Sequence, residues 1–209
     1  MSEIPFRDEL RRKLVHLSSF WMPVVMIFFR SYRWQLAVFF GFLALGSVLV
    51  EHAYARGNQA VQKIYNIFFN NMLRQAPNPT DWVISGGPPV LAASCAVLIF
   101  FPPVLAAGCM ALMLGGDTAA ALIGRRFGHI RFANGKSLEG VVAFILIGAL
   151  AFGIFFSFGE IAFSRLAAAS LIAAIIGALA EFFEKVIRID DNFGIPVFAG
   201  LAVQLFLMF

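Results

Sequence analysis

The chain has 209 residues, of which 60% are hydrophobic and 13% are charged, and its formal net charge is +4. Soluble domains carry roughly 25% charged residues, and the mean hydropathy of this chain is +0.83. These values exclude an ordinary soluble domain and indicate an integral membrane protein. The two cysteines, Cys95 and Cys109, lie in apolar runs, so neither a disulfide framework nor a cysteine metal site is expected.

Seven apolar segments are predicted to cross a membrane, because a span needs about 20 mostly apolar residues. Pro102-Pro103 leaves only a tight hairpin between the third and the fourth segment. The sequence thus predicts an all-α polytopic membrane helix bundle, with residues 1–209 forming a single integral-membrane domain. The predicted spans are 14–30, 34–50, 83–101, 103–123, 139–158, 165–181 and 194–209.

Some of these helices are predicted to be broken. The stretches Gly86-Gly87-Pro88-Pro89 and Gly115-Gly116 are expected to interrupt helices within the membrane. Such breaks are tolerated only where protein or water satisfies the freed backbone groups. Residues 51–82 are polar with interspersed apolar positions, which favours a cytoplasmic amphipathic helix lying on the membrane surface.

The loop charges predict how the chain is oriented. Most lysines and arginines fall in the N-terminal tail and in the loops after the second, fourth and sixth spans. The positive-inside rule therefore places the N-terminus in the cytoplasm and the C-terminus outside. We expect a bacterial inner-membrane protein whose candidate reactive residues share the cytoplasmic face. The polar N-terminal tail has no small-residue cleavage site, so a cleaved signal peptide is not expected.

Asp117 is the strongest single signal, because a carboxylate between two apolar runs is costly in a bilayer. If Gly115-Gly116 breaks the helix, Asp117 or Thr118 can cap the helix that restarts. The N-terminus of that helix would favour phosphate, and the carboxylate is a hard oxygen ligand for Mg²⁺. A simple N-cap is the alternative explanation.

Basic motifs lie on both sides of this aspartate. Arg12-Lys13-xx-His16 opens the first span, where snorkelling cations explain the arginine and lysine but not the histidine. Arg125 and Arg126 follow the fourth span, and Gly135-Lys136-Ser137-Leu138-Glu139-Gly140 opens the fifth. Lys136-Ser137 resembles a nucleotide-binding P-loop, but the glycine spacing of that motif is absent. A turn with an N-cap serine is the alternative for this segment.

Acidic residues gather around the loop after the sixth span, namely Glu181, Glu184 and Asp190-Asp191-Asn192. A solvated acidic loop is the ordinary explanation. Glu181, however, directly follows an apolar run at membrane depth, where a lone carboxylate is costly. Aspartate and asparagine together hold Mg²⁺ in protein kinases, so this segment is a candidate second metal-binding patch.

Taken together, these stretches resemble the CTP-dependent lipid kinase family of dolichol kinase, phytol kinase and CTP-type diacylglycerol kinase, which is distantly related to CDP-diacylglycerol synthase. The cytidylyltransferase signature, Ser-Pro-x-Lys-Thr with a late His-Gly-Gly and Asp-Arg pair, is absent, which favours phosphoryl over nucleotidyl transfer. The matching stretches are Arg12-Lys13-xx-His16, Gly116-Asp117-xx-Ala120-xxx-Gly124-xx-Phe127-Gly128, Lys136-Ser137-Leu138-Glu139-Gly140, and Glu181 with Asp190-Asp191-Asn192-xxx-Pro196.

The resemblance implies a CTP-dependent kinase that transfers the γ-phosphoryl group to the hydroxyl of a lipid alcohol entering from the bilayer. It implies Mg²⁺ as cofactor and CTP as co-substrate, and no nucleic-acid partner is expected. Which alcohol is used (polyprenol, phytol or diacylglycerol) and the oligomeric state stay open. The alternatives are a CDP-lipid-forming cytidylyltransferase and a small membrane transporter, although transporter sites usually lie near the midplane of the membrane.

The expected roles follow the same resemblance. Asp117 and Asp191 are assigned to the metal, with Asn192 as a further ligand or water holder. Glu139 or Glu181 is the expected base for the lipid hydroxyl. The residues expected to bind nucleotide phosphates or to complete the site are Lys136, Arg125, Arg126, Ser137, Lys13 and His16.

Overall fold

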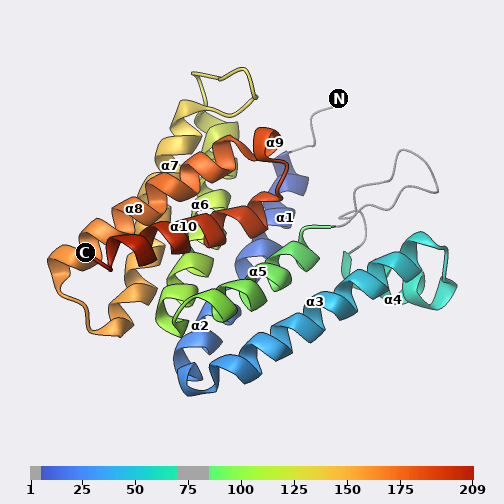
Figure 1. Ribbon diagram of the computed structural model, residues 1–209. Coiled ribbons are helices and arrows are strands. Elements are labelled where there is room, and N and C mark those ends of the chain that lie inside the picture. Colours follow the sequence, from blue (N-terminus) through green and yellow to red (C-terminus); the bar gives the residue numbers. More distant parts are fainter. Residues whose placement is uncertain (1–5, 70–84) are drawn as a thin grey trace.

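The computed structural model describes residues 6–69 and 85–209, which fold into helices, most of them packed around one central helix (Figure 1). No strand occurs in these two segments, so the predicted all-α class is confirmed for them. The helices are α1 (Phe6–Ser18), α2 (Trp21–Phe28), α3 (Arg33–Ala55), α4 (Gln59–Phe69), α5 (Gly87–Phe100), α6 (Pro103–Phe127), α7 (Leu138–Phe156), α8 (Phe163–Phe182), α9 (Glu184–Ile187) and α10 (Asp191–Phe206), with 3₁₀ turns at Arg30–Tyr32 and Ser157–Gly159.

Helix α6 is the central element. It contacts α1, α2, α5, α7, α8 and α10. Every residue from 105 to 118 is buried, including Asp117. A helix that is apolar on all sides belongs in the interior of a bundle, which is where α6 lies. A side chain on α6 is therefore surrounded by several other segments of the chain.

A seam of small residues joins α6 to α7. Gly116, Ala120 and Gly124 succeed one another at steps of four, so they share one face of α6. A Cβ at Gly116 would lie 3.0 Å from the Phe144 ring, and one at Gly140 would lie 3.0 Å from the Ala120 carbonyl oxygen. Small residues at this spacing allow membrane helices to approach closely.

The predicted helix break at Gly115-Gly116 is wrong, because α6 runs through both glycines without interruption. The N-cap expected of Asp117 or Thr118 is wrong for the same reason, since both residues lie inside the helix. The Thr118 hydroxyl instead donates to the Leu114 carbonyl oxygen at 2.7 Å. The glycines serve close packing against α7 rather than a change of chain direction.

Other observed helix boundaries differ from the predicted ones. The first predicted span, 14–30, consists of α1 and α2 with a turn between them. Pro23 explains that turn, because it has no N–H to donate to the Ser19 carbonyl and its ring would clash with that group in a continuous helix. The Gly86-Gly87-Pro88-Pro89 stretch begins α5 rather than interrupting a helix, with the prolines in the first turn. Residues 83 and 84 lie outside the described segments.

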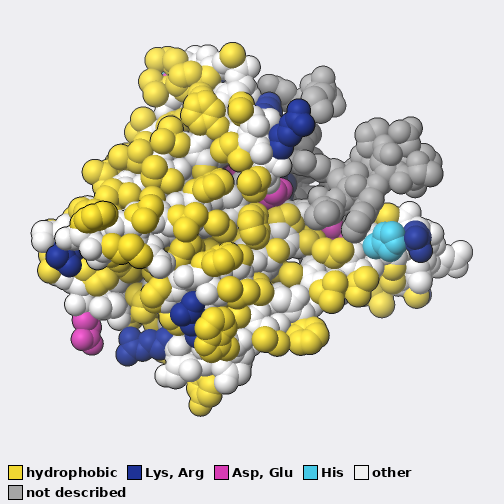
Figure 2. All heavy atoms as spheres, viewed as in Figure 1, with side chains coloured by type: hydrophobic (Ala, Val, Ile, Leu, Met, Phe, Trp, Pro, Cys, Tyr) yellow, Lys and Arg dark blue, Asp and Glu magenta, His cyan; other side chains and the backbone are white. Residues whose placement is uncertain are grey.

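Four helical segments of the described chain are long and apolar enough to cross a membrane: Arg30–Ala55, Pro103–Phe127, Leu138–Gly159 and Phe163–Phe182. Helices α5 and α10 are apolar but shorter, so a total of seven spans stays a prediction. Hydrophobic side chains dominate the face shown in Figure 2. Both observations support an integral membrane protein.

The predicted surface helix 51–82 begins later than expected. Residues 51–55 belong to the end of α3, and a separate helix, α4, spans Gln59–Phe69. The part of the prediction from 70 to 82 lies outside the described residues. The short connection at Pro102-Pro103 is observed, because α5 ends at Phe100 and α6 begins at Pro103. That the two helices form a tight hairpin stays a prediction.

Contacts between helix ends place the polar groups at two opposite ends of the bundle. At one end, Arg33 donates to the carbonyl oxygens of Leu98 and Ile99 at 2.5 and 2.7 Å, which ties the start of α3 to the end of α5. At the other end, Glu51 accepts a hydrogen bond of 2.9 Å from the Ser85 amide, joining the end of α3 to the chain that leads into α5. Which end faces the cytoplasm stays a prediction.

Candidate functional site

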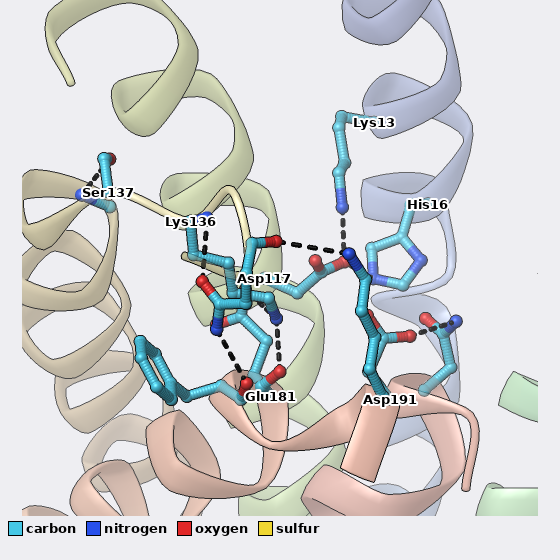
Figure 3. A network of polar contacts seen from close by, with 12 residues as sticks. Lys13, His16, Asp117, Lys136, Ser137, Glu181 and Asp191 are labelled. Atoms are coloured by element: carbon cyan, nitrogen blue, oxygen red, sulfur yellow. Dashed lines mark hydrogen bonds and ion pairs between the residues drawn. The ribbon is translucent and has the colours of Figure 1, made fainter. Parts of the chain in front are cut away.

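A buried ion pair joins α1 to α6. Lys13 is 3% exposed and Asp117 is 8% exposed. The Lys13 Nζ donates to the Asp117 Oδ2 at 2.5 Å, and the His16 Nε2 lies 3.3 Å from the same oxygen (Figure 3). Lys13 and His16 lie three positions apart on α1, so both face α6. Because a buried charge without a partner is strongly destabilising, this pair also holds α1 against the bundle.

A second ion pair joins the loop between α6 and α7 to the end of α8. The Lys136 Nζ lies 3.1 Å from the Glu181 Oε1 and also donates to the Glu181 backbone carbonyl. Glu181 is 8% exposed and sits in the last turn of α8. The Asn134 side-chain amide donates to the Phe182 carbonyl at 3.0 Å. The loop between α6 and α7 is therefore fastened to the end of α8.

This loop, residues 128–137, folds back on itself. The Phe132 amide donates to the Lys136 carbonyl at 2.8 Å, and Arg131 forms an isolated antiparallel bridge with Ser137. Gly135 has φ of +89°, a left-handed conformation that glycine adopts at little cost. The bridge brings Arg131 beside Ser137, although six positions of sequence separate them.

The loop and the ends of α6, α7 and α8 enclose a cavity of about 430 Å³. Its described lining includes three cationic side chains, a hydroxyl and a carboxylate, and glycines keep part of the wall open. Charge-assisted hydrogen bonds from arginine and lysine are the strong interactions available to a phosphate. The lining residues are Ala120, Ala121, Gly124, Arg125, Arg131, Gly135, Lys136, Ser137, Gly140, Val141 and Glu181.

Ser137 both caps α7 and lines the cavity. It is the N-cap of α7, where its Oγ accepts a hydrogen bond of 3.1 Å from the Gly140 amide. It also lines the cavity, so the N-terminus of α7 lies at the cavity wall. The free N–H groups of a helix N-terminus favour an anion. The N-cap alternative considered for this serine is thus observed, and it coexists with a place in the cavity.

Acidic residues from α9 and α10 lie near the first ion pair. Asp190 caps α10 by accepting from the Asn192 amide at 3.0 Å, and the Asn192 side chain donates to Asp190 and Asp191 at 3.0 Å each. Burial raises the pKa of Asp191, the first residue of α10, to about 7, and the carboxylates of Asp117, Glu184 and Asp190 act in the same direction. Carboxyl groups are therefore grouped near Asp117, and Asp191 holds its proton more readily than a solvated aspartate does.

The oxygen donors of this cluster are of the kind that a divalent cation binds. Among the described residues, no three His, Cys, Asp or Glu side chains are grouped closely enough to hold a metal by themselves. Mg²⁺ usually takes one or two protein carboxylates and completes its shell with waters and substrate phosphates. Asp117 and Asp191 interact electrostatically, so they are the candidate pair of carboxylates for such an ion.

Not every predicted residue reaches the cavity. The Glu139 Oε1 accepts from the backbone amides of His129 and Ile130 at 2.8 and 3.3 Å, so this carboxylate braces the loop. Arg126 places its guanidinium carbon 5.4 Å from the centre of the Phe127 ring, and it does not line the cavity. Arg131 does line it and was missed, because nothing in the sequence indicated the bridge to Ser137.

The fold and the site together define an integral membrane protein with a charged, partly enclosed site at one end of its helix bundle. No protein-family model matches the chain, and no solved structure matches it. The chain is 26% identical to an uncharacterised protein of Rickettsia prowazekii, over 96% of both chains.

Two named proteins are also similar. The chain is 32% identical to CTP-dependent diacylglycerol kinase 1 of Saccharomyces cerevisiae, over 49% of this chain and 41% of the yeast protein. It is 25% identical to CTP-dependent diacylglycerol kinase 1 of Eremothecium gossypii, over 97% of this chain and 68% of that protein. These similarities support a relationship to lipid kinases that use CTP. The predicted distant relationship to CDP-diacylglycerol synthase stays a prediction.

Proposed function

We propose that this protein transfers the γ-phosphoryl group of CTP to the hydroxyl of a membrane lipid alcohol, which is a polyprenol, phytol or diacylglycerol. The observation that carries the proposal is the cation-lined cavity beside the buried Lys13–Asp117 pair, at one end of an apolar bundle. The similarity to CTP-dependent diacylglycerol kinases supports the same activity. The proposed orientation has the site at the cytoplasmic face of a bacterial inner membrane.

In this proposal the cavity holds the nucleotide phosphates. Arg125, Arg131 and Lys136 contribute the charge, and Ser137 contributes a hydroxyl at the α7 N-terminus. Phosphoryl transfer depends mainly on positioning and on neutralising charge as it spreads over the transferred group. A lysine already paired to Glu181 is held in place for that role by the α8 end.

The carboxylates are assigned to metal binding and to proton transfer. Asp117 and Asp191 would hold Mg²⁺, assisted by Asn192, and a bound ion would neutralise charge on the triphosphate. Glu181 lines the cavity and interacts electrostatically with Asp117, so we assign it to accept the proton of the lipid hydroxyl. Lys13 and His16 orient Asp117. Glu139 is the second choice for the base.

The test is a labelled-nucleotide assay on the purified protein with Mg²⁺ and a panel of lipid alcohols. Label from the γ-position of CTP is expected in the lipid product, and label from the α-position is not. A product carrying the α-label would instead establish a cytidylyltransferase. UTP and ATP in parallel reactions define the nucleotide preference. Absence of any labelled lipid, together with nucleotide-independent solute flux in liposomes, would favour a transporter.

Arg131 lines the cavity although the sequence did not single it out, whereas Arg126 was predicted to bind the nucleotide and does not line the cavity. Arg131→Ala is expected to raise the KM for CTP about tenfold, the loss of one charge-assisted hydrogen bond. Arg126→Ala, the matched control, is expected to leave that KM within about twofold, because Arg126 does not line the cavity. Steady-state kinetics at saturating lipid measure both values. If Arg126→Ala raises the KM for CTP more than Arg131→Ala does, Arg126 binds the triphosphate and the assignment of Arg131 is contradicted.

A further inference from the structure

A second void lies beside the first, and it is almost wholly apolar. It has a volume of about 350 Å³ and lies between the α1–α2 corner, α6 and α7. Thr118 carries the one side-chain polar group among its described lining residues, and that hydroxyl is already bonded to the Leu114 carbonyl. We call this void the apolar groove; its lining residues are Leu17, Phe20, Gly115, Thr118, Ala119, Ile147, Leu150, Ala151, Ile154 and Phe155.

The apolar groove begins at the level of Asp117. Gly115 and Thr118, which line it, stand on either side of Asp117 along α6. From there it follows α7 from Ile147 to Phe155, away from the end of α7 that borders the cation-lined cavity. The described linings of the two voids share no residue, yet both border the same short stretch of α6. Asp117 itself lines neither void, but it lies on this same stretch of α6, with its carboxylate against Lys13 and His16 of α1.

The groove also opens toward the surroundings of the bundle. Ile147, Leu150 and Ile154 on its rim are 42%, 61% and 53% exposed. Both α6 and α7 belong to segments apolar and long enough to cross a membrane, so this rim faces hydrocarbon when the protein is embedded. A chain can enter sideways from the bilayer without crossing water.

We propose that the apolar groove binds the hydrocarbon chain of the acceptor alcohol and presents its hydroxyl at Asp117. The inference rests on the proposed function, for which it supplies the lipid subsite. The two ends of the groove select the occupant. Its rim of Ile147, Leu150 and Ile154 is apolar and exposed to hydrocarbon, whereas its α6 end lies next to the Lys13–Asp117 pair, where the hydroxyl of an acceptor can meet the proposed nucleotide site.

The first test compares one substitution at two sites on α7. Leu150→Trp adds bulk at the groove rim, whereas Leu146→Trp adds the same bulk one turn earlier, at a side chain that is outside the groove and 65% exposed. Leu150→Trp is expected to raise the KM for the lipid alcohol on the order of tenfold and to leave the KM for CTP unchanged. Leu146→Trp is expected to change neither. Equal effects of the two variants on the lipid KM would overturn the proposal.

The second test does not depend on catalysis. A diacylglycerol with a diazirine in its acyl chain is photolysed with the full-length protein in phosphatidylcholine vesicles, and the labelled peptides are mapped by mass spectrometry. Labelling is expected in the peptide containing residues 147–155 and should be displaced by unlabelled diacylglycerol. Labelling spread over all exposed helices, or displaced equally by added phosphatidylcholine, would mean that bulk lipid fills the groove and would reject the subsite.

The two tests separate the groove from the activity. If no nucleotide supports lipid phosphorylation, the proposed function fails and the photolabelling result alone decides whether the groove binds a lipid alcohol. If phosphorylation occurs but the label maps elsewhere, the proposed function stands and the groove assignment fails.

Discussion

Replacing Asp117 by asparagine is expected to abolish CTP-dependent phosphorylation of the lipid alcohol, with a loss of turnover of at least about a hundredfold. The substitution removes the charge that we assign to Mg²⁺ and leaves Lys13 buried without its partner. Breaking a buried pair by removing one member costs about 3–5 kcal/mol. The variant should therefore also unfold at a lower temperature, measured in detergent alongside turnover.

A double variant separates the two roles of Asp117. Lys13→Met combined with Asp117→Asn removes both buried charges, so it should recover part of the lost thermal stability and none of the activity. Asp190→Asn is the matched control, since it removes a charge from the same cluster and retains an N-cap of equal quality. Asp190→Asn should keep most of the activity. Turnover by the double variant above a few per cent of wild type would exclude Asp117 from the chemistry.

Replacing Gly116 by leucine is expected to destabilise the bundle by about 1–3 kcal/mol or more, the usual cost of overpacking a dense interior. Even a single Cβ at this position would lie 3.0 Å from the Phe144 ring. Leucine forms helix better than glycine by about 1 kcal/mol, so the packing penalty must exceed that gain to be seen. The midpoint of thermal unfolding in detergent is the measurement.

Gly46→Leu is the control for this substitution, because Gly46 lies inside α3 and a Cβ there has no neighbour within 4 Å. It should be neutral or slightly stabilising. Adding Phe144→Ala to Gly116→Leu vacates the space that the leucine needs and should restore part of the stability. A Gly116→Leu protein as stable as Gly46→Leu would mean that α6 and α7 do not pack through this seam.

The fold was predictable where one helix can be recognised by itself. The later spans were predicted to within a few residues of α6, α7 and α8, because their apolar runs have clear ends. Gly115-Gly116 was misinterpreted because glycine serves both chain breaks and close packing, and only the position of Phe144 distinguishes them. The turn before α2 could have been found, since Pro23 lacks the amide that a continuous helix requires.

The site was predictable as a set of residue types but not as an arrangement. Costly charges in apolar runs pointed to Asp117 and Glu181, both of which are buried and paired with lysines. Which lysine joins which carboxylate depends on helix packing that one sequence does not display. Arg131 was not predicted for a similar reason, since its place beside Ser137 arises from the hydrogen bonds that fold the loop.

The separation of the two voids along α6 has a consequence for the order of events. Because their described linings share no residue, neither substrate needs to pass through the compartment of the other. On the proposed function, nucleotide and lipid can bind in either sequence, and a covalent enzyme intermediate is unnecessary because both can be present at once. The phosphorylated lipid can leave sideways into the bilayer while the spent nucleotide returns to water, so release of one product does not wait for the other.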